Sequence, residues 1–271
     1  MDLSSKIKFL SKLTTNNIKE YFKEQIPVNN EPLVYNSVNW YGHATTLINM
    51  SDTIVLTDPI IGNHLGYFKR VVERPFDLTT QRTDYILLSH GHMDHLNFSS
   101  LSKLNKDSVI IVPYGYNRII SLMGYKNVVT LRDGEVYKDD NIKITAIEAN
   151  HDGRRFYFGV DKDSNSYMIE KNNKKVFYAG DTAFTETYKG LKSNVALMPV
   201  GCYKPDNFSE MHCTPLEGYQ MFKMMDSKAM IPIHYKTFKI SLEVFDETYQ
   251  TLKNIDDSKI KLIDIGSTYK F

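Results

Sequence analysis

The sequence predicts an α+β fold in which two β-sheets pack face to face and helices cover both outer faces, a four-layer αββα sandwich. β-type runs dominate two stretches of the chain, with helical segments between and after them. Strands and helices do not alternate strictly, and no glycine-rich loop follows a strand, so neither a Rossmann nor a P-loop fold is indicated.

The chain begins with a helix and linker over residues 1–32, and residues 33–271 form one domain with no dividing linker. The N-terminus lacks the apolar core of a secretory signal, and no later window is long enough to span a membrane. Ile18, Tyr21 and Phe22 form a weak apolar stripe at helical spacing. We expect this stripe to pack on the body of the protein, so membrane contact is at most peripheral.

Composition excludes several classes of protein. The 33 basic and 32 acidic residues leave a formal net charge of +1, which provides no field to attract nucleic acid. Cys202 and Cys213 fit neither a disulfide framework nor a zinc motif, and we expect packing or loop positions for both. These features predict a cytoplasmic protein.

The expected elements follow from apolar and alternating runs bounded by turn residues. Strands are expected at 33–40, 44–50, 53–57, 85–88, 109–112, 166–170, 175–178, 196–200, 229–233 and 259–265, with two or three more within 128–149. Helices are expected at 97–104, 214–226 and 242–253. The long irregular connection over residues 62–83 is of a length that usually serves a nearby site.

The most informative stretch follows the apolar run 85–88. It contains His90, His92, Asp94 and His95 within six residues. Neutral imidazoles and carboxylates are ligands for zinc, manganese or iron. We expect His90 and His92 to converge on one ion and Asp94 and His95 to face a second. The alternative is a histidine-rich polar turn, which the spacing H-x-H-x-D-H disfavours.

Three further candidate ligands each follow an apolar strand. They are His151 after 142–149, Asp181 after 176–179, and His234 after 230–233. Each is weak evidence alone, because a lone histidine or aspartate after a strand is usually structural or exposed. Strand ends at one edge of a sheet converge, so together these residues complete a metal site.

This order of ligands resembles the metallo-β-lactamase-fold hydrolases, from about residue 33 to the C-terminus. The resemblance implies a hydrolase domain over 33–271 with two divalent metal ions. It assigns His90, His92 and His151 to one metal, Asp94, His95 and His234 to the other, and Asp181 as a bridge. This cysteine-free set fits two Zn²⁺, with Mn²⁺ or Fe also compatible. The glutamate that di-iron redox members carry at the position of His92 is absent.

Finer motifs narrow the branch of the family. Residues 40–45 and 56–59 look like the opening motifs of the branch that contains N-acylphosphatidylethanolamine phospholipase D and the ascorbate-6-phosphate lactonases. Residues 198–205, 214–217 and 233–238 look more like the phospholipase D side. The resemblance therefore implies a phosphodiesterase that uses a metal-bridging hydroxide on a small-molecule or lipid phosphodiester.

Catalytic roles are expected for three residues. Asp94 or Asp181 would orient the bridging water, and His212 would contact substrate or pass a proton to the leaving group, unless it is an ordinary loop histidine. His43 and Asp58 stay open between a role at the site and a purely structural one. The basic residues near the ligands either bind phosphate oxygens or are solvated: Arg154, Arg155, Lys204 and Lys236.

Competing hypotheses share the same metal site. A lactonase or carboxylic-ester hydrolase acting on a small phosphorylated metabolite is the main alternative, because metal ligands do not select the substrate. A nuclease is disfavoured by the near-neutral charge. A non-catalytic binding protein would be expected to have lost ligands, and all seven positions are filled. Natural substrate and oligomeric state are not predicted.

Overall fold

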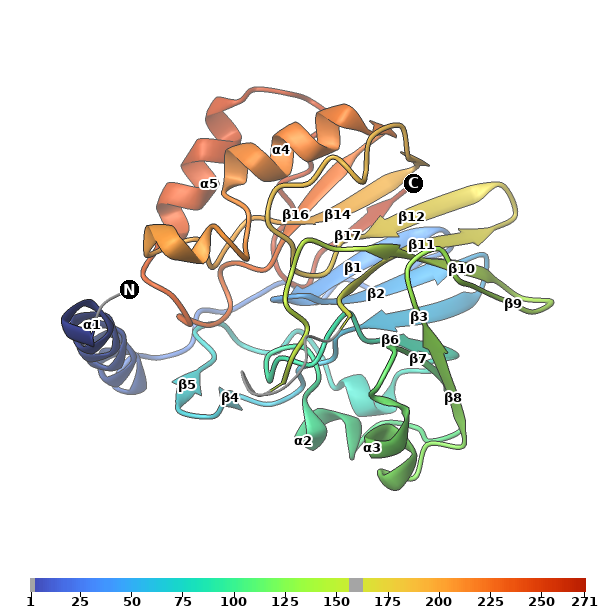
Figure 1. The fold of residues 1–271 in the computed structure, drawn as a ribbon, viewed down its shortest axis with the longest axis horizontal. Helices are drawn as coiled ribbons and strands as arrows, with labels where there is room; N and C mark the ends of the chain where they lie inside the picture. The colour runs from blue at the N-terminus through green and yellow to red at the C-terminus, as the bar shows by residue number, and fades with distance from the viewer. Residues whose placement is uncertain (1–2, 156–162) are drawn as a thin grey trace.

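A seven-stranded sheet forms one half of the sandwich. The structure is a computed structural model that describes residues 3–155 and 163–271. This first sheet has the strand order β17-β1-β2-β3-β6-β7-β8 (Figure 1). Its strands are β1 (Ser37–Gly42), β2 (Thr45–Met50), β3 (Thr53–Thr57), β6 (Tyr85–Leu87), β7 (Val109–Pro113), β8 (Asn127–Leu131) and β17 (Thr268–Lys270). β3, β6, β7 and β8 run parallel to one another, so their carboxyl ends share one edge.

A six-stranded sheet forms the other half, in the order β16-β14-β12-β11-β10-β9. Its strands are β9 (Val136–Lys138), β10 (Lys143–Glu148), β11 (Asn165–Lys171), β12 (Lys174–Tyr178), β14 (Val195–Pro199) and β16 (Met230–Ile233). β12, β14 and β16 are parallel. The turn between β11 and β12 is Asn172-Asn173, with both φ values positive, as a two-residue hairpin requires.

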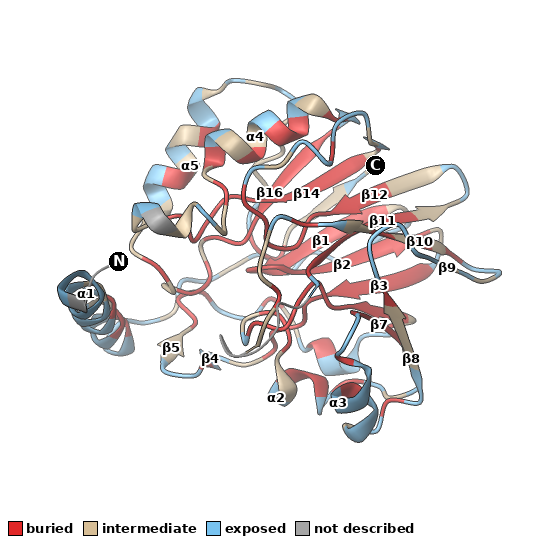
Figure 2. Cartoon of the chain, in the orientation of Figure 1, coloured by how far each residue is buried: buried red, intermediate tan, exposed pale blue. Residues whose placement is uncertain are grey.

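The main core lies between the two sheets. Trp40 and Val55 of the first sheet belong to the same buried cluster as Tyr167 and Phe177 of the second. Tyr41, the neighbour of Trp40, belongs to a second cluster on the opposite face of the first sheet. β1, β2 and β3 are buried along their whole length because both of their faces are covered, and the strands are red throughout in Figure 2.

Helices cover the outer faces. α2 (Phe98–Leu101) and α3 (Asn117–Leu122) lie beside the first sheet, and α4 (Pro215–Met224) and α5 (Phe245–Asn254) beside the second (Figure 1). α4 begins at a capping box in which Thr214 and Glu217 satisfy each other's backbone N–H groups. These four layers confirm the predicted αββα sandwich.

The connection over residues 62–83 contains the short hairpin of β4 (His64–Leu65) and β5 (Phe68–Lys69). Arg70, which follows it, is fully buried and donates to the carbonyl oxygens of Tyr41 (3.3 Å) and Ile60 (3.0 Å). Its guanidinium thereby holds this loop against β1. The remaining short elements are β13 (Lys192–Ser193), β15 (Asp226–Ser227) and the 3₁₀ turns Leu78–Thr80 and Asp206–Phe208.

The N-terminal helix α1 (Leu3–Tyr21) lies at the side of the sandwich (Figure 1). Its inward face is formed by Leu13, Asn17 and Glu20. The expectation that this stripe packs on the body of the protein is therefore wrong for Ile18 and Phe22, whereas Tyr21 contacts Tyr67 and His64. These three side chains are 54%, 45% and 87% exposed, because the helix is rotated so that another face meets the domain.

Two further features differ from the sequence prediction. Residues 259–265 do not form a strand and make only an isolated bridge between Ile260 and Met230. The last strand is instead β17, which pairs with β1 through Tyr269 and Val38. α3 was not predicted. Within residues 3–155 and 163–271, no helix combines the length and apolar character needed to cross a bilayer.

Candidate metal centre

The seven predicted ligands lie together at one edge of the sandwich. The segment 89–95 follows β6, His151 follows β10, Asp181 follows β12 and His234 follows β16. Both sheets thus bring strand ends to this place, and the ligand atoms gather in overlapping groups within 4.8 Å of one another.

The first group consists of His90, His92 and His151. Nδ1 of His92 lies 3.1 Å from Nε2 of His151. Nδ1 of His151 donates to the carbonyl oxygen of Met211 at 2.7 Å, which leaves its Nε2 lone pair for the cluster. Nε2 of His90 is buried without a hydrogen-bond partner among the described residues. Burial of a bare imidazole nitrogen is costly unless a ligand completes it.

The second group consists of His43, Asp94, His95 and His234. The Nε2 atoms of His95 and His234 are only 3.2 Å apart. Oδ2 of Asp94 lies 3.5 Å from Nε2 of His95 and 3.6 Å from Nε2 of His234. Basic nitrogens and carboxylate oxygens that converge in this way form a donor set suited to a divalent cation.

Asp181 lies between the two groups, because its carboxylate is within 4.8 Å of ligand nitrogens of His90 and His151 as well as of His95. Its oxygens are 3.0 Å from Nε2 of His95 and 3.1 Å from Nε2 of His234. Burial opposes ionisation of this carboxyl, but the charges of His234 and His95 outweigh burial and hold the pKa of Asp181 well below its usual range. Burial likewise opposes charge on His234, but Asp181 raises the pKa of His234 to about 9. His212, the remaining predicted residue, has Nε2 3.4 Å from Asp181.

Asp58 stabilises the cluster through its contact with the ligand candidate His95. Its Oδ2 lies 2.6 Å from Nδ1 of His95, and it also accepts from the hydroxyls of Ser89 and Tyr178, both at 2.5 Å. The backbone N–H of Ser89 donates to Oδ1 at 2.8 Å. A carboxylate at Nδ1 keeps a proton on that nitrogen, so Nε2 is the nitrogen that would bind an ion. Asp58 is thus more than a turn residue.

His43 also belongs to the site. Its Nε2 lies 3.1 Å from Oδ2 of Asp94, and its ring centroid is 4.0 Å from that of His234. Burial lowers the pKa of His43 to about 4, so the ring is neutral and donates to Asp94. The backbone N–H of His234 donates to the carbonyl oxygen of His43 at 2.9 Å.

Several non-glycine residues around the cluster adopt positive φ. The described ones include His43 (52°), Asp58 (31°), Cys202 (69°) and His234 (65°). Such backbone costs about 1–3 kcal/mol per residue and persists where the surrounding structure requires it, commonly at functional sites.

The four basic residues near the ligands separate into two kinds. Arg155 donates to the carbonyl oxygens of Leu96 (2.6 Å) and Gly91 (3.1 Å), so it braces the histidine loop. Arg154 forms an ion pair with Asp152 at 2.5 Å.

Lys204 and Lys236 contact α5 instead of the cluster. Lys204 pairs with Glu247 at 2.8 Å, and Nζ of Lys236 lies 4.1 Å from the ring centroid of Tyr249. Within residues 3–155 and 163–271, neither lysine contacts a predicted ligand.

Two supporting groups were not predicted from the sequence, Tyr178 and the carbonyl of Met211. A tyrosine at the end of an apolar strand needs a partner for its buried hydroxyl, which was the available indication for Tyr178. Nothing in the sequence marks the Met211 carbonyl.

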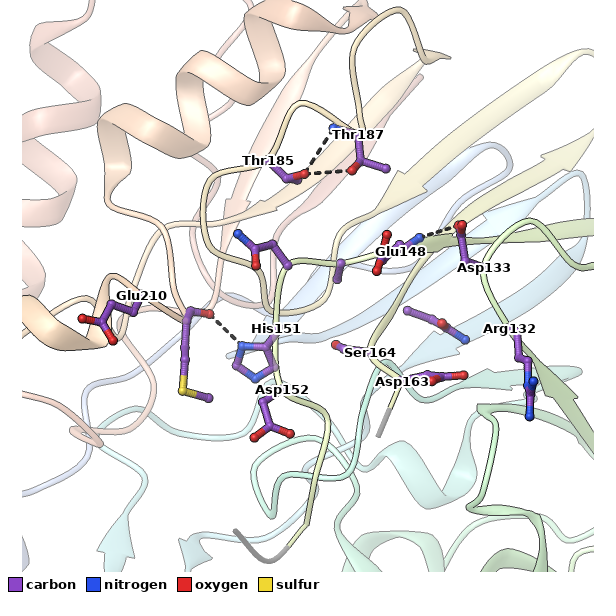
Figure 3. Close-up of a pocket in the computed structure, with 14 residues that line it drawn as sticks. Arg132, Asp133, Glu148, His151, Asp152, Asp163, Ser164, Thr185, Thr187 and Glu210 are labelled. Atoms are coloured by element: carbon purple, nitrogen blue, oxygen red, sulfur yellow. Dashed lines mark hydrogen bonds between the residues drawn. The ribbon is translucent and has the colours of Figure 1, made fainter. Parts of the chain in front are cut away.

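Two cavities adjoin the cluster. One, of about 700 Å³, is polar and lies on the outer side of His151, with Asp133, Glu148, Asp152 and Glu210 around it (Figure 3).

The other cavity, of about 520 Å³, reaches the cluster at His92, Asp94 and His212. Its remaining wall is mainly apolar: Phe9, Leu13, Leu65, Phe68, Met93, Arg155, Cys202, Phe208 and Ile240. The 62–83 connection lies near the cluster as expected, since it contributes Leu65 and Phe68 to the wall of this cavity.

The fold and this donor set define a metal-dependent hydrolase. The family model described as the beta-lactamase superfamily domain matches residues 53–235, which contain all the predicted ligands, and the chain belongs to this family. The predicted resemblance is confirmed.

Curated relatives include a phospholipase D and a metal-dependent hydrolase. The chain is 30% identical over 243 residues to the mitochondrial N-acyl-phosphatidylethanolamine-hydrolyzing phospholipase D of Saccharomyces cerevisiae, covering 81% of this chain and 51% of the yeast protein. It therefore spans about half the length of that relative. A metal-dependent hydrolase of Bacillus cereus is 26% identical over 246 residues, covering 85% of this chain and 98% of the relative.

Solved structures share the fold. An isothiocyanate hydrolase from Delia radicum gut bacteria superposes with a TM-score of 0.71 at 18% identity, covering 87% of this chain and 99% of that chain. A metallo hydrolase from Ignicoccus hospitalis gives 0.65 at 21% identity, covering 87% and 98%. These similarities support the αββα architecture.

Proposed function

We propose that the protein is a dinuclear metal-dependent phosphodiesterase whose substrate carries an apolar group beside the phosphodiester. The observation that carries the proposal is the junction of the apolar cavity with the His/Asp cluster at His92, Asp94 and His212. A substrate with an apolar chain can bury it in this cavity while its polar head reaches the cluster. The phospholipase D-like motifs and the yeast relative support the choice of a phosphodiester.

The proposed ligands divide as the resemblance implies, and the geometric groups are compatible with that division. His90, His92 and His151 would hold one ion, Asp94, His95 and His234 would hold the other, and Asp181, which lies near members of both groups, would be available to either. The donor set of imidazoles and carboxylates fits two Zn²⁺, and Mn²⁺ or Fe are compatible. When bound, such ions lower the pKa of water toward neutrality and polarise the phosphoryl oxygen.

The protein groups orient the reactants. Asp94 or Asp181 would accept a hydrogen bond from the attacking water and so orient it. His212 is 13% exposed, lines the apolar cavity and lies 3.4 Å from Asp181. It is placed to donate a proton to the leaving alkoxide. His43 keeps Asp94 oriented through its 3.1 Å contact.

The proposal also includes the division into an N-terminal helix and linker, residues 1–32, and a hydrolase domain, residues 33–271. A cytoplasmic location remains part of it, because Cys202 and Cys213 are both buried and unpaired.

Phosphorus NMR of the zinc- or manganese-loaded protein with N-acylphosphatidylethanolamine and with a water-soluble glycerophosphodiester tests the activity. We expect phosphomonoester to accumulate with the wild type and with Asp140→Asn, which changes an exposed aspartate in a turn. Asp181→Asn should abolish it. The identity of the monoester shows which side of phosphorus is cleaved.

Intact diesters with a fully metallated wild-type protein would overturn the phosphodiesterase proposal. Hydrolysis of lactones or carboxylic esters by the same preparation would then select the alternative, since the same donor set polarises a carbonyl oxygen.

A further inference from the structure

The outward face of α1 carries an exposed apolar stripe, whose last helical residue, Tyr21, also contacts Tyr67 and His64. Ile7, Leu10, Ile18 and Tyr21 are 59%, 54%, 54% and 45% exposed. Their spacing, with Thr14 between them, places them along one side of the helix. The stripe continues beyond the helix into Phe22, which is 87% exposed. We call Ile7, Leu10, Ile18, Tyr21 and Phe22 the α1 stripe.

The charge of α1 indicates what the stripe contacts. The helix contains Lys6, Lys8, Lys12 and Lys19, all exposed, and its only acidic residue is Glu20. Glu20 is 8% exposed and neutralised by Lys23 (2.9 Å) and Lys239 (2.8 Å). The outer surface of α1 therefore carries only positive charge beside its apolar stripe, a pattern that suits an anionic lipid surface.

The stripe leads to the mouth of the apolar cavity. Phe9 and Leu13, on the inner side of the same helix, line that cavity. The hydroxyl of Tyr21 donates to the carbonyl oxygen of Tyr67 at 2.8 Å, and Tyr67 itself is 45% exposed. Met93, which also lines the cavity, is 48% exposed. One apolar rim thus joins the outside of α1 to the cavity.

We propose that the α1 stripe and its lysines dock the protein onto an anionic membrane surface, with the apolar cavity beside the docked helix. The lysines attract the protein to the surface, and the apolar side chains enter the interface of the bilayer. The surface lies beside the metal cluster and does not depend on which ester the cluster hydrolyses.

Vesicle co-sedimentation of the zinc-loaded full chain tests the proposal, using phosphatidylcholine vesicles with and without phosphatidylserine. We expect binding to the phosphatidylserine vesicles that weakens as salt rises. The triple variant Ile7→Ser/Leu10→Ser/Ile18→Ser should bind about tenfold more weakly or worse, because it removes three apolar side chains from the interface. Lys8→Gln/Lys12→Gln/Lys19→Gln should lose the preference for phosphatidylserine.

The matched control is Ile119→Ser/Leu122→Ser/Val136→Ser, which removes three exposed apolar side chains from α3 and β9. It should bind vesicles like the wild type. The proposal is overturned if the wild-type protein binds neither kind of vesicle. It is also overturned if the triple variant of the α1 stripe binds vesicles as the wild type does. Light scattering that shows a dimer dissociated by the stripe substitutions would assign the stripe to a second copy of the chain and also overturn it. The assay needs no turnover, so its result is separate from that of the phosphodiesterase test.

Discussion

Oδ2 of Asp58 lies 2.6 Å from Nδ1 of His95, and both side chains are fully buried. Asp58 directly follows β3, and His95 ends the histidine loop that follows the neighbouring parallel strand β6. Sheet pairing therefore sets the position of one predicted ligand. Because Asp58 contacts His95, we predict that an uncharged residue at position 58 will weaken metal binding although all ligand residues are still present.

Replacing Asp58 with asparagine is expected to lower zinc affinity about 10–100-fold, the usual effect of losing a partner behind a ligand histidine. The amide carries no charge and no longer fixes the tautomer of His95. Competition with a chromophoric zinc chelator measures the change. Tyr178→Phe is the control, because it removes another donor to Asp58 and leaves the His95 contact. Unchanged affinity in Asp58→Asn would mean that Ser89, whose Oγ is 3.3 Å from His95 Nδ1, orients the ring instead.

Loss of His151 is expected to empty one metal position and spare the other. His151 belongs to the group with His90 and His92, whereas His234 belongs to the group with Asp94. The metal content, measured by mass spectrometry, should fall from two ions per chain in the wild type to one in His151→Ala. His64→Ala is the matched control, because that exposed histidine stacks on Tyr21 outside the cluster. Two ions retained in His151→Ala would contradict the proposed division of ligands.

Stability of the metal-free protein should depend on pH through His43. Burial lowers its pKa from 6.5 to about 4, so the unfolded chain takes up this proton at higher pH than the folded one. The contribution of neutral His43 to stability is complete above pH 6.5 and is lost as the pH falls toward 4. Between pH 6.5 and 4, the free energy of unfolding should fall less steeply with decreasing pH in His43→Gln than in the wild type. The difference in slope should be up to about 1.4 kcal/mol per pH unit.

Urea midpoints of metal-free wild type and His43→Gln, compared across this acidic window, measure the difference. The raised pKa of His234, about 9, does not interfere there, because its effect appears only as the pH rises above 6.5. Parallel curves for the two proteins would show that His43 does not titrate as its burial requires.

Local patterns were sufficient for most of the fold. The strands on either side of the Asn172-Asn173 turn and the helix that starts at the Thr214 cap depend on neighbouring residues, and these elements were predicted. The error at 259–265 has a non-local cause. That run is apolar enough for a strand, but only Ile260 bridges Met230, while the less apolar β17 finds an open edge on β1. The sequence does not show which edge is free.

The candidate ligands were predictable because each follows an apolar strand and uses a side chain with few other roles. The role of Tyr178 was not, because its partner Asp58 lies 120 positions away, and a tyrosine at a strand end shows that its hydroxyl needs a partner without showing which residue that is. The orientation of α1 was missed for a similar reason. Its inward face includes polar Asn17, which donates to the carbonyl oxygen of Lys239 at 2.9 Å, so hydrophobicity alone identified the wrong side of the helix.

Gly201 controls the position of His234 through close packing of their backbones. A Cβ at Gly201 would lie 2.1 Å from the carbonyl oxygen of His234, and Gly201 has no unusual φ, so the conflict is steric. Gly201→Ala should destabilise the fold by about 1–3 kcal/mol and displace His234. We expect reduced zinc content as well as a lower urea midpoint. Gly62→Ala is the comparison, since its nearest atom is 3.3 Å away. Full zinc content in Gly201→Ala would show that the His234 backbone moves without carrying the imidazole out of the cluster.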